Sequence, residues 1–225
     1  MLLWLASYPR SGNTFLRVIL NKIFDLPSVD IYGAKSEQAF INNGTMFQAM
    51  GGVTHEMAPE ELISHAREDD YLSVVKTHER LKNDDPAIYI VRDGRSSIVS
   101  YYHYLMNVEG SINSLEDIIK GKVYAGSWSE HIYDWAPESR HRTLFIRFEN
   151  LVTRPDLEIE RIGQFLCLEP RSKTTMTFEM LHETFPQFFR SGSDEKNIRE
   201  LEDSGHLDLF WRWHTPMMVR LGYAQ

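Results

Sequence analysis

Residues 7–16 bring together side chains that can bind an anion. They follow an apolar run that predicts a buried strand, and they precede apolar residues at helical spacing. A tight turn from a strand into a helix points backbone N–H groups at a bound anion. Gly12 lets the backbone close on a phosphate. Ser11 and Thr14 offer hydroxyls, and Arg10 adds a fixed positive charge.

This stretch leaves two interpretations open when it is taken by itself. The phosphate loop of nucleoside triphosphatases, G-x-x-x-x-G-K-[ST], is absent because the chain has no Gly-Lys-Ser/Thr in this stretch. A Ser-Gly turn between a strand and a helix also occurs in ordinary βα connections. Residues 7–16 are therefore either an anion site or such a connection.

Two further polar clusters follow predicted strands. The segment 76–78, Lys-Thr-His, comes after apolar residues 71–75, and the segment 92–95, Arg-Asp-Gly-Arg, comes after apolar residues 87–91. The carboxyl ends of parallel strands meet at one edge of a sheet, where ligands bind. The three clusters together predict one anion-binding crevice at that edge.

The order of predicted elements favours an α/β fold with a central parallel sheet flanked by helices, because its strands are separated by helical segments. The predicted strands are residues 2–6, 71–75, 87–91 and 143–148. The length of 225 residues fits a single domain, 1–225. Residues 28–58 carry mixed signals with Asn-Gly and Gly-Gly pairs, and we expect a mobile segment over a binding site there.

Composition excludes some classes of function. The formal net charge of -8 argues against a protein that coats nucleic acid, whose surface would be basic. No run approaches the ~20 apolar residues that span a membrane, and no signal peptide is evident. We therefore expect a cytoplasmic protein. The one cysteine, Cys167, lies in an apolar helical stretch and is expected to be a small core residue.

Five motifs, in order, resemble those of the cytosolic-type sulfotransferases, which move a sulfuryl group from 3′-phosphoadenosine 5′-phosphosulfate (PAPS) to a hydroxyl or amine. The matching segments are 8–15 (Tyr-Pro-Arg-Ser-Gly-Asn-Thr-Phe), 76–78 (Lys-Thr-His), 90–103 (Ile-Val-Arg to Tyr-His), 147–155 (Arg-Phe-Glu-Asn-Leu to Pro) and 189–192 (Phe-Arg-Ser-Gly). The resemblance implies the P-loop-like sulfotransferase fold. The short chain is typical of a compact, bacterial-type member.

The resemblance implies a catalytic set of four residues: His78, Arg10, Lys76 and Ser100. His78 is the expected general base, because an imidazole with a pKa near ~6.5 can take a proton from a hydroxyl at neutral pH. Lys76 is expected to neutralise the sulfonate oxygens, and Arg10 the bridging oxygen of the donor. Glu79 is the alternative base.

The resemblance also implies the residues that bind PAPS and its product, 3′,5′-adenosine bisphosphate. They are Arg10, Ser11, Gly12, Asn13, Thr14, Phe15, Arg92, Ser100, Phe148, Arg190, Ser191 and Gly192. Arg92 and Ser100 are expected to hold the 3′-phosphate, with Arg190 closing it. Phe15 either stacks on adenine or belongs to the core. Fixed cations can take the place of magnesium, so we expect no metal.

Three residues depart from the family pattern. Arg10 replaces a lysine, Phe148 a tyrosine and Ser191 a lysine. Arg10 reshapes one contact to the donor, since a guanidinium is a planar fork and an ammonium a point charge. Phe148 lacks the hydroxyl of the tyrosine, and Ser191 removes one contact to a phosphate. The family's dimerisation motif is not evident after residue 190, so the oligomeric state stays open.

The acceptor is expected to be a small molecule with a hydroxyl or amine. Its candidate walls are the loops between residues 28 and 55 together with Tyr101, Tyr104, Trp128, Tyr133 and Trp135. Two other classes of function remain: a small-molecule kinase or nucleotide hydrolase with the same kind of sheet, and a nucleotide-binding protein without catalytic activity.

Overall fold

The computed structural model describes residues 1–80, 83–172, 177–186, 189 and 194–224. Within these ranges it contains one six-stranded sheet in the order β3-β2-β4-β1-β5-β6, and every pairing is parallel. The strands are β1 (Leu2–Ala6), β2 (Ser28–Asp30), β3 (Gly52–Val53), β4 (Ser73–Thr77), β5 (Ala87–Val91) and β6 (Thr143–Arg147). The predicted α/β fold with a central parallel sheet is confirmed.

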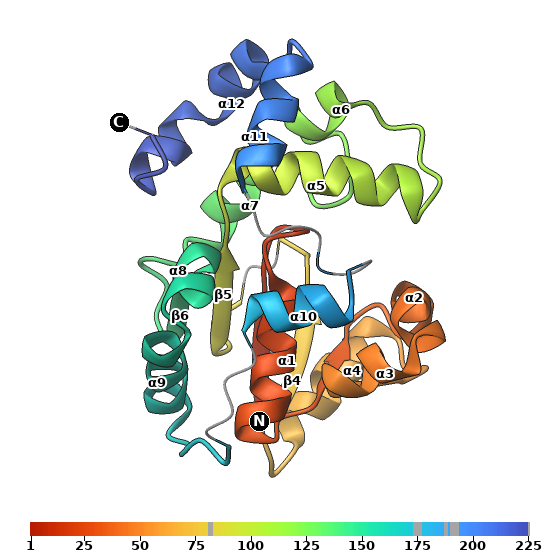
Figure 1. Ribbon diagram of the computed structural model, residues 1–225. Coiled ribbons are helices and arrows are strands. Elements are labelled where there is room, and N and C mark those ends of the chain that lie inside the picture. Colours follow the sequence, from red (N-terminus) through yellow and green to blue (C-terminus); the bar gives the residue numbers. More distant parts are fainter. Residues whose placement is uncertain (81–82, 173–176, 187–188, 190–193, 225) are drawn as a thin grey trace.

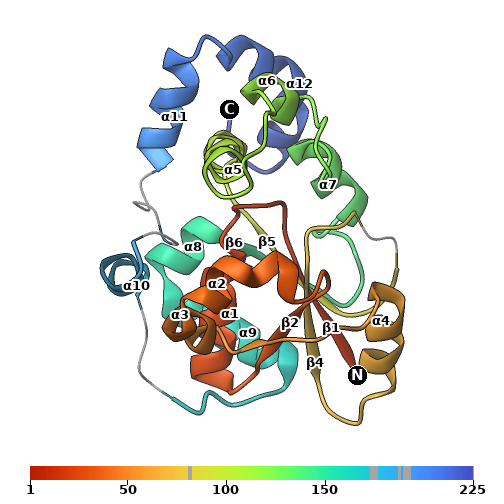
Figure 2. The same ribbon diagram turned by 90° about the vertical axis from the view of Figure 1, so that its right-hand side faces the viewer.

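Helices cover both faces of this sheet, and a further group lies beyond its carboxyl edge (Figures 1 and 2). The helices are α1 (Asn13–Phe24), η1 (Ala34–Glu37), α2 (Gln38–Asn42), α3 (Gly44–Ala49), α4 (Pro59–Glu68), α5 (Gly94–Asn107), α6 (Leu115–Ile119), α7 (Trp128–Trp135), α8 (Phe148–Thr153), α9 (Pro155–Leu166), α10 (Phe178–Thr184), α11 (Asp194–Asp203) and α12 (Leu207–Arg220). Both views place α5, α6, α11 and α12 beyond that edge.

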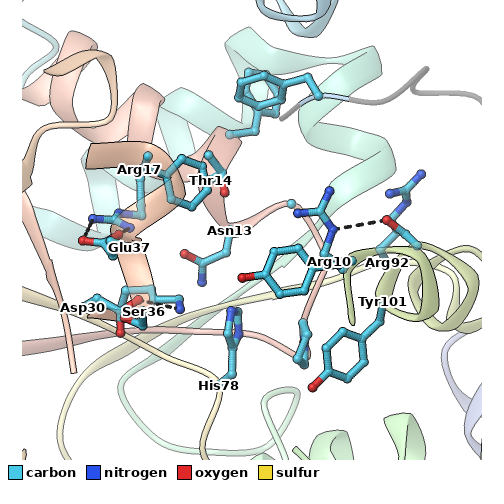
Figure 3. Close-up of a pocket in the computed structure, with 18 of the residues that line it drawn as sticks. Arg10, Asn13, Thr14, Arg17, Asp30, Ser36, Glu37, His78, Arg92 and Tyr101 are labelled. Atoms are coloured by element: carbon cyan, nitrogen blue, oxygen red, sulfur yellow. Dashed lines mark hydrogen bonds and ion pairs between the residues drawn. The ribbon is translucent and has the colours of Figure 1, made fainter. Parts of the chain in front are cut away.

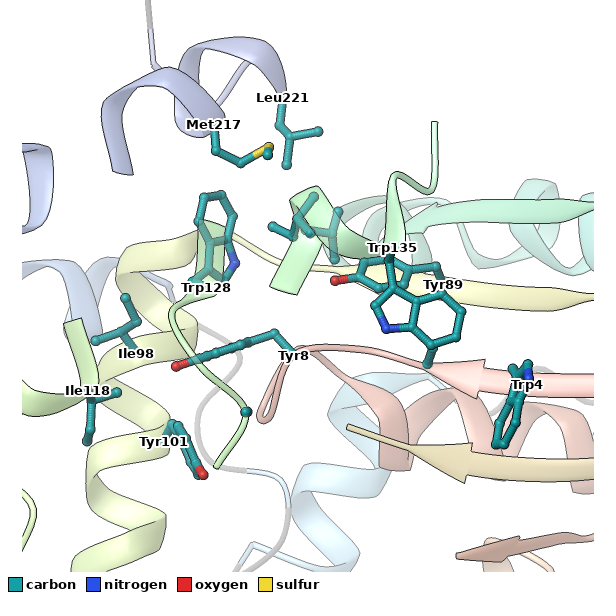
Figure 4. Close-up of a cluster of buried hydrophobic side chains, with 14 of the residues drawn as sticks. Trp4, Tyr8, Tyr89, Ile98, Tyr101, Ile118, Trp128, Trp135, Met217 and Leu221 are labelled. Carbon is teal, nitrogen blue, oxygen red and sulfur yellow. The ribbon is translucent and has the colours of Figure 1, made fainter. Parts of the chain in front are cut away.

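The central strand β1 shows why the sheet is buried on both sides. Leu3 and Leu5 pack into the core cluster that contains α1 and α9. Leu2, Trp4 and Ala6 pack into the other cluster, which contains α7 and α12 (Figure 4). Side chains alternate across a strand, so a parallel sheet covered on both faces requires a continuous apolar run. Residues 2–6 supply that run.

Residues 28–58 correct the sequence-based expectation of an irregular segment, whereas their mobility over a binding site stays a prediction. They form β2, η1, α2, α3 and β3, and β2 pairs with β4 inside the sheet. Strands of three and two residues are too short to show a period of two, and turn residues dominate the remainder. Part of this stretch does line a pocket, through Ser36, Glu37 and Phe40.

Cys167 is a second correction. It is exposed, and it ends α9 in the left-handed conformation, with φ 55. The apolar period of α9 stops one residue earlier, at Leu166. In the described part of the chain, no helix is both long and apolar enough to cross a bilayer.

Candidate active site

A pocket opens at the carboxyl ends of β1, β4 and β5, and all three polar clusters line it (Figure 3). The predicted residues that line it are Arg10, Gly12, Asn13, Thr14, Phe15, Lys76, His78, Arg92, Ser100 and Phe148. Residues 76 and 77 belong to β4 itself, because the strand runs two positions further than the sequence predicts. Arg190, Ser191 and Gly192 lie outside the described residues.

Ser11 is the one residue of the segment 9–15 that does not line the pocket. Its side chain is fully buried, and its hydroxyl is 3.4 Å from that of Ser97 on α5. The loop turns tightly, with Arg10 at φ 65 and Gly12 at φ 100, and α1 begins directly after it. The hydroxyl of Ser11 therefore ties the loop to α5, while Thr14 faces the pocket.

Gly12 is required by a close approach as well as by its backbone angle. A Cβ added there would lie 2.3 Å from Cδ2 of Phe148, whose side chain is buried. The loop and α8 are thus packed so tightly that only a glycine fits between them.

Gly12→Ala is expected to lower the free energy of unfolding by about 2–4 kcal/mol, since it adds both backbone strain and overlap with Phe148. Denaturant unfolding measures this change. The matched control is Gly44→Ala, where an added Cβ meets nothing within 4 Å. Its expected effect is within about 0.5 kcal/mol. Equal changes in the two variants would contradict the packing argument.

The ring of His78 is held in one orientation and one tautomer. Its Nδ1 is 2.8 Å from the carbonyl oxygen of Ser7 and 3.3 Å from the Ser7 hydroxyl. A carbonyl only accepts, so Nδ1 carries the proton and Nε2 keeps its lone pair. Burial lowers the pKa of His78 well below its usual range, and the charge of Lys76 lowers it further. The result is a neutral imidazole with a free acceptor nitrogen.

Helix α7 fixes the backbone that carries this histidine. Nε2 of His131 lies 3.0 Å from the carbonyl oxygen of His78 and donates to it, and Nε1 of Trp135 donates to the carbonyl oxygen of Glu79 at 2.8 Å. Burial lowers the pKa of His131 to about 3, so this ring is neutral as well. Hydrogen bonds from α7 therefore fix the backbone of both His78 and Glu79, the two residues that could act as the general base.

Two cations, Lys76 and Arg10, line the same pocket as His78. Lys76 forms an ion pair of 2.7 Å with Asp30 at the end of β2. Arg10 donates from Nε to the Ser100 hydroxyl over 3.2 Å, and its guanidinium lies 5.4 Å from the ring centroid of Tyr104. The loop after β1, strand β4 and helix α5 thus direct positive charge into one pocket.

Arg92, which follows β5, lies at another wall of the pocket. Its Nη2 is 2.7 Å from Oδ1 of Asp194, at the first position of α11. Its guanidinium packs over the Phe148 ring, 4.7 Å from the centroid. The ring that replaces the family's tyrosine therefore contacts the arginine that is predicted to bind phosphate.

An aromatic wall is the part of the pocket that the sequence revealed least. Phe178 forms edge-to-face contacts with Phe15, Phe148 and Phe189, at centroid distances of 5.5–5.6 Å. All four rings line the pocket. Phe15 is at the same time buried in the core, which confirms that interpretation, while its stacking on adenine stays a prediction. Phe178 was missed because nothing in its local sequence separates it from other helix-starting aromatics.

Two of the five candidate residues for the acceptor walls, Tyr101 and Tyr104, line the pocket. The three others correct the prediction, since Trp128 and Trp135 are buried in the core and Tyr133 is exposed on the surface. Tyr32, from the predicted loops between residues 28 and 55, also lines the pocket, and so does Tyr124, which lies in a connection that no periodicity places.

In the ranges that the structure describes, no group of three or more His, Cys, Asp or Glu side chains could hold a metal ion. Several of the charged side chains that line the pocket form ion pairs. Besides the Lys76 and Arg92 pairs, a buried pair joins Arg17 on α1 to Glu37 on η1.

Comparison with known proteins gives consistent matches. The model of the family described as "Sulfotransferase domain" matches residues 2–202. The chain is 28% identical to "Sulfotransferase 1B1" of Mus musculus over 72% of this chain and 57% of that one. It is 27% identical to "Sulfotransferase 1E1" of Homo sapiens over 80% of this chain and 63% of that one. The chain thus spans about 57% of the length of the first curated relatives that it matches.

Two solved structures share the fold. Mouse sulfotransferase SULT7A1, complexed with PAP, has a TM-score of 0.63 at 19% identity and covers 95% of this chain and 84% of its own. Retinol dehydratase, in a complex with retinol and PAP, has a TM-score of 0.66 at 16% identity and covers 96% and 81%.

Proposed function

The chain belongs to the sulfotransferase domain family, and on that premise we propose that it transfers a sulfuryl group from PAPS to a hydroxyl or amine of a small acceptor. One observation carries the proposal. A neutral His78 with its Nε2 lone pair available lies in the same pocket as the anion-binding loop, Lys76 and Arg92. Two of the relatives with this fold are described with PAP bound, which supports PAPS as the donor.

The pocket suits the donor on two counts. The loop turns directly into α1 at the pocket, so an anionic group there can approach the backbone N–H groups at the start of that helix. Thr14 lines the same pocket, and its hydroxyl can donate to an oxygen of the phosphosulfate. We propose that residues 10–14 hold the phosphosulfate, and that the bound donor supplies the sulfuryl group.

The opposite end of the donor needs a site for the 3′-phosphate and a surface for the adenine ring. We propose that Arg92 and Ser100 bind the 3′-phosphate, joined by Arg190 and by the backbone of Ser191 and Gly192. A guanidinium fork suits two phosphate oxygens. The aromatic wall around Phe178 offers adenine a flat apolar surface.

In the proposed mechanism His78 accepts the proton of the acceptor hydroxyl at Nε2, while Ser7 holds Nδ1–H. Lys76 and Arg10 face the charge that develops on the sulfonate and on the bridging oxygen. Transfer of this kind needs mainly positioning and electrostatic stabilisation. The fixed cations supply both without a covalent step on the protein, and we propose that no metal takes part.

The acceptor side of the pocket is proposed to be the wall formed by Tyr32, Tyr101, Tyr104 and Tyr124. Burial raises the pKa of Tyr32, Tyr101 and Tyr104, so these three phenols stay neutral hydrogen-bonding groups. Retinol and androsterone, which are bound to the structural relative retinol dehydratase, are small alcohols. We propose an uncharged hydroxyl acceptor of similar size, and a cytoplasmic setting for the reaction.

A transfer assay tests this function. The protein is incubated with PAPS and a panel of phenols, alcohols and amines, and acceptor mass and 3′,5′-adenosine bisphosphate are followed together. The expected result is one sulfuryl group gained for each bisphosphate formed, unchanged by a chelator. Turnover that requires ATP and magnesium instead would favour a kinase or nucleotide hydrolase.

The acid limb of the pH–rate profile is expected below pH ~6.5, the ordinary value for histidine, because the pKa of His78 is lowered. As pH falls, kcat/KM stays constant through that value and declines only when His78 takes a proton. Lys76→Met removes a charge that lowers this pKa, so the limb should move to higher pH. A wild-type limb at or above pH ~6.5 would contradict the assignment.

A further inference from the structure

Strand β2 places a buried carboxylate beside the proposed catalytic lysine. In the β2–β4 ladder Asp30 pairs directly with Lys76. Oδ2 of Asp30 lies 2.7 Å from Nζ of Lys76, and the exposed side-chain fractions are 2% and 13%. Both residues line the pocket that contains His78 (Figure 3). This is therefore a preformed ion pair at the reaction site.

The carboxylate of Asp30 is fixed independently of the lysine. Its Oδ1 accepts the backbone N–H of Tyr32 at 2.9 Å. The backbone carbonyl of the same aspartate accepts from Nε2 of His55 at 2.6 Å. The ring of Tyr32 in turn lies 5.4 Å from Nζ of Lys76. Asp30 thus holds one end of the pair still and gives the ammonium of Lys76 a fixed partner.

A lysine needs such a constraint more than an arginine does. Its ammonium is a point charge on a flexible four-carbon stem, and it can reach any anion within range. In this pocket an unrestrained ammonium could move onto the phosphates of the bound nucleotide. It would then bind the ground state and product, and such binding does not lower the barrier to transfer.

We propose that Asp30 is a positioning residue: it holds the ammonium of Lys76 toward the sulfuryl group and away from the nucleotide phosphates. The inference rests on the proposed function. It assigns to the short strand β2 a role in the reaction, and it predicts that loss of the carboxylate impairs turnover without impairing nucleotide binding.

The test is a cycle of three variants: Asp30→Asn, Lys76→Met and the double variant. Asp30→Asn keeps the shape of the side chain and the contact with Tyr32. We expect it to lower kcat about 10-fold or more, while 3′,5′-adenosine bisphosphate binds at least as tightly as to wild type. In the Lys76→Met background the same change is expected to alter kcat less than about 2-fold, because Asp30 acts through the lysine.

Glu37→Gln is the matched control, because Glu37 is an equally buried carboxylate at the same pocket that pairs with Arg17 instead. Its effect on kcat should be the same with Lys76 present or absent. Asp30→Glu, which retains the charge, is expected to recover part of the activity that Asp30→Asn loses. Additive losses for Asp30→Asn and Lys76→Met, or weaker bisphosphate binding by Asp30→Asn, would overturn the proposal.

A second measurement does not depend on turnover. Competitive acetylation with acetic anhydride, read by mass spectrometry, reports how reactive Lys76 is relative to the other lysines. An ion-paired ammonium is a poor nucleophile. Lys76 should therefore be acetylated several-fold faster in the Asp30→Asn variant than in the wild type, and at the wild-type rate in the Glu37→Gln variant. An unchanged rate would overturn the positioning role even if sulfuryl transfer were established. A faster rate in a protein without transfer activity would support the pairing and contradict only the proposed function.

Discussion

Replacing His78 by alanine is expected to lower the rate of sulfuryl transfer at least ~100-fold, the range in which a general base contributes. The reason is local. The ring is anchored through Nδ1 to the Ser7 carbonyl, and its remaining nitrogen is the proton acceptor that the pocket offers beside Lys76. Steady-state kinetics with saturating donor and acceptor would measure the loss.

The same variant should still bind nucleotide. His78 takes no part in the proposed phosphate contacts, so the affinity for 3′,5′-adenosine bisphosphate should change less than about 3-fold. His65→Ala, an exposed histidine on α4, is the matched control and should keep full activity. Turnover that survived the loss of His78 would transfer the role of base to Glu79. Loss of binding would mean that the histidine supports the fold of the loop.

Arg92→Ala is expected to have the second large effect, and to act on binding. A charge-assisted contact contributes about 1.5–3 kcal/mol, which corresponds to roughly 10- to 100-fold in affinity for the bisphosphate. Removing the guanidinium also leaves Asp194 beside the phosphate, since the two side chains are paired 2.7 Å apart. Like charges then add to the loss.

The effect should be selective for the 3′-phosphate. AMP, which has none, should bind the variant and the wild type alike, so the preference for the bisphosphate over AMP should disappear. Arg95→Ala is the control, because Arg95 is bound by Asp93 and packs over Trp211. Calorimetric titration separates the cases. An equal loss for AMP and bisphosphate would place Arg92 outside the 3′-phosphate site.

The main features of the site could be predicted because they depend on local sequence. The loop that begins at Ser7, the pair Lys76 and His78, and Arg92 come at the ends of apolar strands, and parallel strands bring their carboxyl ends to one edge. Physical rules on strands and their ends were enough to gather these residues. The family resemblance then supplied their expected roles, which the predictions above are designed to test.

The remaining residues depend on tertiary structure. Asp30 lies on a strand of three residues that carries no readable period, and its importance comes from a partner 46 positions away. Tyr32 and Tyr124 lie in connections, while Phe178 joins the pocket only because α10 packs against α1 and α8. No local pattern specifies such contacts.

Trp128 and Trp135 illustrate the opposite error, since aromatic residues near a predicted site were taken for its walls. Both face inward from α7, where their indole N–H groups donate to the carbonyl oxygens of Arg92 and Glu79. They contribute by fixing the chain segments that carry site residues. Their burial in the core also accounts for the tight contact at Gly94, where an added Cβ would lie 2.8 Å from Trp128.

The most direct test of the central claim is a thermal-shift titration without metal, with 3′,5′-adenosine bisphosphate, AMP and ATP as ligands. A ligand at 100 times its dissociation constant stabilises the folded state by about 2.7 kcal/mol, which such a titration detects readily. We expect marked stabilisation by the bisphosphate and little by AMP or ATP at equal concentration. Equal responses to all three, or a preference for ATP, would contradict the assignment of a PAPS site in this pocket.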